Sequence, residues 1–289
     1  MEIIVAGNTG LCYGVRRALS IVRRTCGSAA GPVRTLGDIV HNPRVVADLE
    51  RRGVRSAASP ADVRGGTVVI RSHGIPPEVR RRLLRKKLEV VDATCPIVSG
   101  IQELVAGLTR SGGEVVLFGN PGHPEVLGLL GYGRGRVVVV EDEAGARALP
   151  WRRTRAVIAQ STQDEALFGR VAAALVERTG ELRVHNTICR SARARQRATA
   201  ELAARVDVMF VVGGKKSSNT AKLAGIARRI RPRTYCVEDA SGIRPAMLRG
   251  AGTIGVSGGA STPPEVLREV VERIKTRIEH KNPREKRVQ

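Results

Sequence analysis

The sequence has few aromatic residues and no long apolar run, and both absences narrow what the protein can be. Aromatic side chains make up 2% of the 289 residues, so stacking platforms for single-stranded bases are scarce. No stretch approaches the roughly 18 to 20 consecutive apolar residues of a membrane span. The N-terminus enters a strand-like run directly, without the basic and apolar segments of a signal peptide. We therefore expect a soluble, cytoplasmic protein with no membrane partner.

Acidic residues are also scarce. The chain has 27 Asp and Glu residues and 49 Lys and Arg residues, which gives a net charge of +22. Such a charge raises the alternative of a nucleic-acid-binding module, whose affinity would fall steeply with salt. The arginines lie mainly on the polar faces of helical patterns, for example Arg80, Arg81 and Arg82, or Arg193, Arg195 and Arg197. We interpret the charge as a solvated surface and expect no nucleic-acid partner. An acidic protein or an anionic substrate would also be attracted by this positive charge.

The five cysteines contain no C-x-x-C pair, which argues against zinc ribbons and ferredoxin-type clusters. An odd number of thiols without an export signal fits a reducing compartment. Cys12, Cys95 and Cys189 each end a strand-like run, and they are spaced almost evenly, 83 and 94 residues apart. They would meet at a centre, as metal ligands, if the three parts of the chain that they mark pack around an axis. From spacing alone they are equally well small packing residues, and we assign that role to Cys26 and Cys236.

Runs of β-branched residues alternate with segments of helical period along the whole chain, which predicts an α/β protein with parallel sheets. The strand-like runs include those that start at Val68, Val115, Val137, Ala156, Val208 and Thr253. Two helical stripes are Val15, Ala18, Leu19, Val22 and Ile97, Ile101, Leu104, Val105, Leu108. A unit of strand, glycine-containing turn and Pro-Glu-Val helix start occurs three times, ending at Val79, Val126 and Val266.

Three histidines in loops, His41, His73 and His123, indicate a basic pocket that donates hydrogen bonds, and phosphate is its natural ligand. The segment GGKKSSNTAKL places Ser217, Ser218 and Asn219 between a strand and a helical pattern. This segment lacks the spacing of a Walker A loop, so nucleotide binding is not implied, and its alternative role is that of a helix cap.

Glu125 is the one carboxylate beside a loop histidine in this expected pocket. A carboxyl group near a buried metal or an anionic ligand has a raised pKa, which suits a proton donor. Ser161 and Thr162 follow a strand and add hydroxyl groups that could relay protons. The residues thus predict a three-part α/β enzyme with a thiolate-bound metal and a pocket for a small phosphorylated compound.

Eight motifs taken in order resemble the family of 4-hydroxy-3-methylbut-2-enyl diphosphate reductases, also called the LytB family. They are GLCYGVRRAL, VHNP, RSHGI, VDATCP, GHPEVLG, NTIC with a following RQ, GGKKSSN and GVSGGAS. The resemblance extends from the first strand to the helix near Ile278. In such enzymes the diphosphate of an allylic alcohol is reduced to isopentenyl and dimethylallyl diphosphate, the last step of the non-mevalonate isoprenoid pathway.

The resemblance implies a 4Fe-4S cluster on Cys12, Cys95 and Cys189, with one iron left open to the C4 hydroxyl of the substrate. It implies that Glu125, Ser161 and His123 are catalytic. It assigns substrate binding to His41, His73, His123, Ser161, Ser217, Ser218, Asn219 and Ser261, all of which except Ser161 would hold the diphosphate. Electrons would come from a donor such as ferredoxin or flavodoxin, for which a basic surface is suited.

We expect three small α/β subdomains arranged with pseudo-three-fold symmetry around a central cluster cavity. The first spans residues 13–95, the second 96–189, and the third 1–12 with 190–279. Residues 280–289 form a charged tail that we expect to be disordered.

Several positions depart from the family's pattern and keep alternatives open. Ser161 stands where threonine is usual, Ala192 and Arg193 replace a Thr-Thr pair, and Gly214 and Lys216 replace Ser and Asn. One alternative is a paralogue that acts on a related allylic diphosphate. Another is a zinc centre on the three cysteines that hydrolyses a phosphoester.

Overall fold

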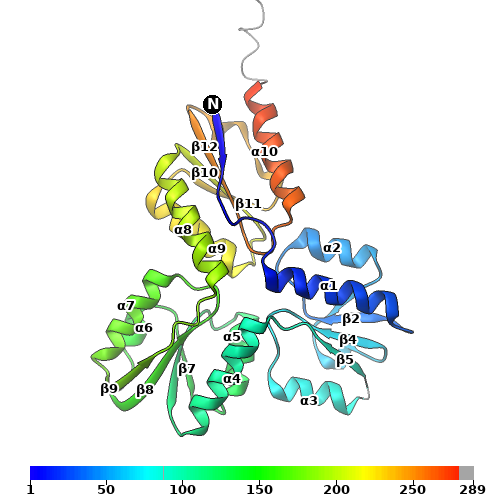
Figure 1. Ribbon diagram of the computed structural model, residues 1–289, viewed down its shortest axis with the longest axis vertical. Coiled ribbons are helices and arrows are strands. Elements are labelled where there is room, and N and C mark those ends of the chain that lie inside the picture. Colours follow the sequence, from blue (N-terminus) through cyan, green and yellow to red (C-terminus); the bar gives the residue numbers. More distant parts are fainter. Residues whose placement is uncertain (87, 280–289) are drawn as a thin grey trace, which may run out of the picture. The chain divides into compact units, whose positions relative to one another are not determined.

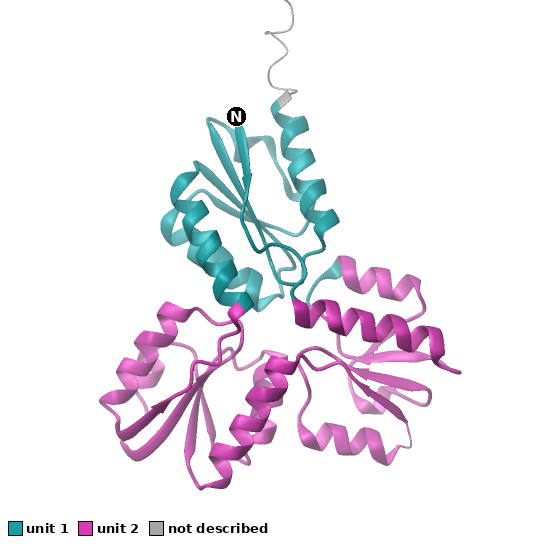
Figure 2. Ribbon diagram, in the orientation of Figure 1, with its two compact units in different colours: residues 1–12, 41–43, 191–289 teal, residues 13–40, 44–190 magenta. Residues whose placement is uncertain are grey.

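A computed structural model describes residues 1–86 and 88–279 of the chain (Figure 1). The expected tail at 280–289 lies outside the described residues. The chain forms two compact units (Figure 2). The first contains residues 1–12, 41–43 and the chain from residue 191, and the second contains residues 13–40 and 44–190. No helix in the described part combines the length and hydropathy needed to cross a lipid bilayer.

The first unit is built on one parallel sheet with the strand order β1-β12-β10-β11. Its strands are β1 (Glu2–Val5), β12 (Thr253–Gly258), β10 (Val208–Val212) and β11 (Thr234–Val237). Its helices are α8 (Arg190–Arg205), α9 (Ser218–Ile230) and α10 (Pro264–Glu279), with the 3-10 turns η2 (Ala240–Gly242) and η3 (Pro245–Leu248).

Strand β10 is buried along its whole length because both faces of this sheet are covered. Phe210 belongs to a core that includes Val270 and Ile274 of α10. Met209 points to the opposite core, which includes Leu202 of α8 and Leu223 of α9. The uninterrupted apolar run from Val208 therefore predicts this strand and its two-sided burial correctly.

The second unit contains two parallel sheets, with the strand orders β3-β2-β4-β5 and β7-β6-β8-β9. The first is made of β2 (Val33–Leu36), β3 (Arg55–Ala57), β4 (Thr67–Ile70) and β5 (Glu89–Asp92), with α1 (Tyr13–Ser28), α2 (Pro43–Arg51), η1 (Pro60–Asp62) and α3 (Pro77–Arg85). The second is made of β6 (Glu114–Phe118), β7 (Val137–Val140), β8 (Arg152–Ala159) and β9 (Thr179–Val184), with α4 (Pro96–Arg110), α5 (Pro124–Tyr132), α6 (Glu143–Arg147) and α7 (Glu165–Val176).

The three sheets share one topology. Positions are counted here from the edge strand that precedes Cys12, Cys95 or Cys189. In chain order, both sheets of the second unit fill the third, fourth, second and first positions, and the sheet of the first unit keeps the order third, fourth, second after its first position has been filled. The N-terminal strand β1 supplies the first position of the sheet whose other strands come last in the chain. The predicted α/β class with three parallel sheets is confirmed, whereas the subdomain boundaries and the central cavity stay predictions.

Two details of the predicted pattern need correction. Helices α3, α5 and α10 begin at Pro77, Pro124 and Pro264, as the Pro-Glu-Val units indicate. However, the strands β4 and β12 of two units occupy the second sheet position, while β6 occupies the third. In helix α4 the apolar stripe uses Val98, which is buried, instead of Ile97, which is exposed, because the helix turns by about 100° per residue and neighbouring residues lie on different faces.

Gly255 of strand β12 packs closely against neighbouring side chains, so its substitution should change the stability of the fold. A Cβ atom on Gly255 would lie 2.3 Å from the Met209 Sδ and 3.0 Å from the Leu202 Cγ, whereas one on Gly225 of helix α9 would meet nothing within 4 Å. We expect Gly255→Ala to lower the free energy of unfolding by about 1–3 kcal/mol through overpacking. The control Gly225→Ala should raise it by up to about 1 kcal/mol, since alanine favours the helix. Chemical denaturation measures both, and equal effects would contradict the described core.

Candidate functional site

The three strand-end cysteines occupy the same position in their three sheets. Each follows an edge strand, and its backbone N–H donates to a carbonyl in the loop after the neighbouring strand. The N–H of Cys12 donates to Ala260 at 2.9 Å, that of Cys95 to Ser72 at 3.0 Å and that of Cys189 to Ser161 at 2.9 Å. All three thiols are half-buried and none forms a disulfide. This is a donor set of soft, accessible sulfur ligands, which suits iron in a cluster.

The other two cysteines have the surroundings expected of packing residues. Cys236 on β11 contacts the core that contains Leu223, and Cys26 lies near the end of α1. Burial raises the pKa of both thiols and keeps them protonated. A protonated thiol is a poor nucleophile and a poor metal ligand.

Glu125 is a buried carboxyl group held by a single neighbouring residue. Its side chain is 2% exposed. The backbone N–H of Ser161 donates to Oε1 at 2.6 Å, and the Ser161 hydroxyl donates to Oε2 at 2.7 Å. Burial raises the pKa of Glu125, and the two hydrogen bonds from Ser161 offset this only in part. The group therefore retains a proton at a higher pH than an exposed carboxyl group would.

The Glu125–Ser161 pair is directly connected to one of the cysteines. The Ser161 carbonyl accepts the N–H of Cys189, while its hydroxyl faces the carboxyl group. One residue thus links a buried carboxyl group to a strand-end cysteine. The sequence indicates Glu125 and Ser161 separately. Their contact joins α5 to the end of β8, across a sequence separation of 36 residues.

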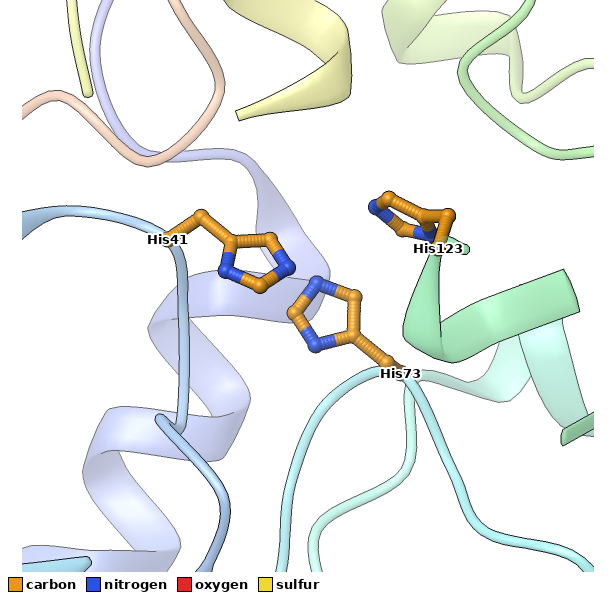
Figure 3. Close-up of side chains that lie close together, drawn as sticks. All are labelled: His41, His73 and His123. Carbon is orange, nitrogen blue, oxygen red and sulfur yellow. The ribbon is translucent and has the colours of Figure 1, made fainter. Parts of the chain in front are cut away.

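His123 caps helix α5 and lies against His73. Its Nδ1 accepts the N–H of Glu125 at 3.2 Å, so in the neutral ring the proton is on Nε2, which can donate to an anion. The ring centroids of His73 and His123 are 5.3 Å apart, and the two rings meet edge to face (Figure 3). His73 follows Ser72, the residue that accepts the N–H of Cys95. The second unit therefore gathers two histidines, two cysteines and the Glu125–Ser161 pair on the loops at the carboxyl ends of its strands.

In the first unit, the serine-rich segment forms the beginning of helix α9. Ser217 is the N-cap, and its hydroxyl accepts the N–H of Thr220 at 3.3 Å. Ser218 and Asn219 form the first turn, where free N–H groups and the helix dipole favour an anion. The prediction of a cap and that of an anion site are compatible here.

His41 and Ser261 lie beside this segment in the same unit. The Ser261 hydroxyl donates to the His41 carbonyl at 3.5 Å, a long hydrogen bond. A Cβ atom on Gly214 would be 2.4 Å from the same carbonyl oxygen, so only glycine fits there. The departure at Gly214 is thereby explained by a close backbone approach.

Sequence reasoning missed Gln160, which lies next to the Glu125–Ser161 pair. It is fully buried, with 0% exposure. Its Oε1 accepts the N–H of Asn120 at 3.1 Å, and its Nε2 donates to the Thr162 hydroxyl at 3.2 Å. These bonds hold the loop before α5 against the loop after β8. No local pattern in the sequence distinguishes such a bridging glutamine from any other.

Comparison with known proteins gives the family. The family model described as "LytB protein" matches residues 3–275. The chain is 42% identical over 279 residues to the 4-hydroxy-3-methylbut-2-enyl diphosphate reductase of Aquifex aeolicus, covering 95% of this chain and 96% of that protein. It is 41% identical over 275 residues to the protein of the same name from Geobacter metallireducens, covering 95% and 97%.

Solved structures agree with this match. One described as (E)-4-hydroxy-3-methyl-but-2-enyl diphosphate reductase, the terminal enzyme of the non-mevalonate pathway, has a TM-score of 0.67 and 40% identity, and covers 96% of this chain and 100% of that one. The reductase structure from Plasmodium falciparum has a TM-score of 0.88 at 24% identity, covers 94% and 87%, and shows the shared fold. With its match over nearly the whole length and its three parallel sheets, this chain belongs to the LytB family.

Proposed function

We propose that this protein reduces (E)-4-hydroxy-3-methylbut-2-enyl diphosphate to isopentenyl and dimethylallyl diphosphate, as the names of its relatives suggest. The observation that carries the proposal is the buried Glu125 carboxyl group on Ser161, whose carbonyl holds Cys189. A protonated acid beside a sulfur ligand suits a reaction that consumes protons and electrons together.

Cys12, Cys95 and Cys189 would hold a 4Fe-4S cluster, with one iron left without a cysteine ligand. Their equivalent positions, at the end of an edge strand in each sheet, support this assignment. When bound, the cluster supplies electrons and a Lewis-acidic iron open to the substrate hydroxyl.

The diphosphate would be held by histidines, hydroxyl groups and a helix N-terminus. The first turn of α9 offers backbone N–H groups, and His123 offers its Nε2 proton. The residues that we assign to this role are His41, His73, His123, Ser217, Ser218, Asn219 and Ser261, while Ser161 would contact the substrate at its hydroxyl end.

Glu125 supplies the proton, and Ser161 passes it on. When Glu125 is protonated, its O–H can donate to the Ser161 oxygen while the Ser161 hydroxyl donates onward, because that hydroxyl is both donor and acceptor. The overall reaction takes two electrons and two protons: the C4–O bond breaks, one C–H bond forms, and the hydroxyl leaves as water. Proton delivery to either end of the allylic system gives the two product isomers.

The electron donor would be a small acidic carrier such as ferredoxin or flavodoxin, because the chain carries a net charge of +22. None of the five cysteines forms a disulfide, which fits the reducing cytoplasm. No nucleic-acid partner is part of this proposal.

The experiment that tests the function is anaerobic turnover of the diphosphate substrate with a chemical one-electron donor. The wild-type protein should release both products, and Glu125→Gln should lower kcat by about 100-fold or more while still binding the substrate. Ser161→Thr should keep most activity, because it keeps the hydroxyl, and Ser161→Ala should lose it.

Glu78→Gln is the matched control for Glu125→Gln. Glu78 occupies the same Pro-Glu-Val position on α3, but it is exposed and forms ion pairs with Arg81 and Arg82. Its variant should turn over like the wild type. Colourless wild-type protein with zinc and phosphoester hydrolysis would refute the proposal, and normal turnover by Glu125→Gln would remove Glu125 from the mechanism.

Burial of Glu125 also predicts how stability depends on pH. Its folded pKa is raised above 4.5, so between 4.5 and the raised pKa the folded state binds more protons than the unfolded state. Stability from this group is complete below 4.5 and is lost as the pH rises through the folded pKa, by at most about 1.4 kcal/mol per pH unit. Denaturation of wild type and Glu125→Gln across this window should show the extra decline in the wild type alone. Parallel curves would mean that Glu125 is not a buried acid.

A further inference from the structure

Arg195 on helix α8 is a buried charged side chain, only 5% exposed. Burying a guanidinium group is unfavourable unless it is well hydrogen-bonded. Its Nη2 donates to the Gly10 carbonyl at 2.6 Å, and its Nη1 donates to the Ser191 carbonyl at 3.3 Å and to the Ser191 hydroxyl. These hydrogen bonds offset part of the cost of burying the group.

Both segments that Arg195 joins lead to a cysteine. Gly10 precedes Cys12 by two residues, and Ser191 follows Cys189 by two residues. Two residues of chain span at most about 7 Å, so the charge is held close to the Cys12 backbone. Gly10 has a φ of 83°, which allows the chain to turn at this contact.

Arg17 makes the corresponding contact in the second unit. It lies on α1, the helix that begins directly after Cys12, and its Nη1 donates to the Thr94 carbonyl at 3.0 Å. Thr94 is the residue before Cys95. Twice, therefore, an arginine on the helix that follows one cysteine holds the backbone just before another. The two contacts join residues that are 77 and 185 positions apart in the sequence, so no local motif could have predicted them.

We propose that Arg17 and Arg195 are positioning residues that hold the Cys95 and Cys12 loops and place a fixed positive charge beside each ligand. The inference rests on the proposed function, because it concerns the cluster that these cysteines would bind. A positive charge nearby stabilises thiolates, and it also stabilises the added negative charge of a reduced cluster. Both arginines should therefore raise the reduction potential, beyond any effect on folding.

The test is redox titration of anaerobically purified protein, with iron and acid-labile sulfide counted for each variant. Arg195→Gln and Arg17→Gln should shift the midpoint potential to more negative values. Arg195→Lys, which keeps the charge but not the forked geometry, should stay near the wild-type potential. All three should lose iron to a chelator severalfold faster than the wild type, because the loop is held less firmly.

Two controls separate these effects from a general loss of charge. Arg205→Gln removes an exposed arginine at the far end of α8, and Arg24→Gln does the same on α1. Both should match the wild type. Circular dichroism reports folding, and if Arg195→Gln does not fold, Arg17→Gln and Arg195→Lys decide the question.

Wild-type potential in folded Gln variants with full iron content would overturn the inference. A shift in Arg195→Lys as large as that in Arg195→Gln would overturn it too, because charge would not be the cause. Wild-type protein without iron and sulfide would instead overturn the proposed function, and the inference with it.

Discussion

The parallel pairing of an edge strand with its neighbour is the interaction on which the site depends. In each sheet this pairing continues past the strand ends as one further hydrogen bond, from a cysteine N–H to a carbonyl of the neighbouring loop. Parallel strands end on the same side of their sheet, so every loop after a strand reaches that side. The chain repeats this arrangement three times and thereby presents one thiol in the same way from each sheet.

The repeats have been adapted differently around a shared backbone. Ser72 and Ser161 occupy equivalent positions, beside Cys95 and Cys189. The Ser72 hydroxyl donates to the Ile39 carbonyl, while the Ser161 hydroxyl donates to the Glu125 carboxyl group. One copy of the position thus supports the backbone and another faces an acid. Burial of that acid lowers stability as the pH rises and lets the group keep its proton to a higher pH than an exposed carboxyl group would.

Much of the fold could be predicted because it depends on local patterns. The run from Val208 is apolar throughout, as a doubly covered strand requires, and Pro124 marks the start of α5. Strands β2 and β3 were missed because they are short and carry polar residues such as Arg34 and Arg55. Their register depends on pairing with other strands and not on their own composition.

The candidate site residues could be named from the sequence, but the residues that support them could not. Cysteine, histidine and glutamate carry recognisable chemistry, so Cys12 or Glu125 can be identified from the residue and its neighbours. Gln160, Arg17 and Arg195 act through contacts between distant segments, and nothing adjacent in the sequence marks them. The repeated Pro-Glu-Val pattern also follows strands that occupy two different sheet positions, the second for β4 and β12 and the third for β6. The pattern does not distinguish them, because strand order is set by tertiary pairing.

We propose that the three equivalent cysteines together hold one iron-sulfur cluster. The most direct measurement is the iron and acid-labile sulfide content of anaerobically purified single serine variants. Cys12→Ser, Cys95→Ser and Cys189→Ser should each lose most of the cluster, whereas Cys26→Ser and Cys236→Ser should keep the wild-type content. Full iron and sulfide in any of the first three variants, or their loss only in the last two, would contradict the account.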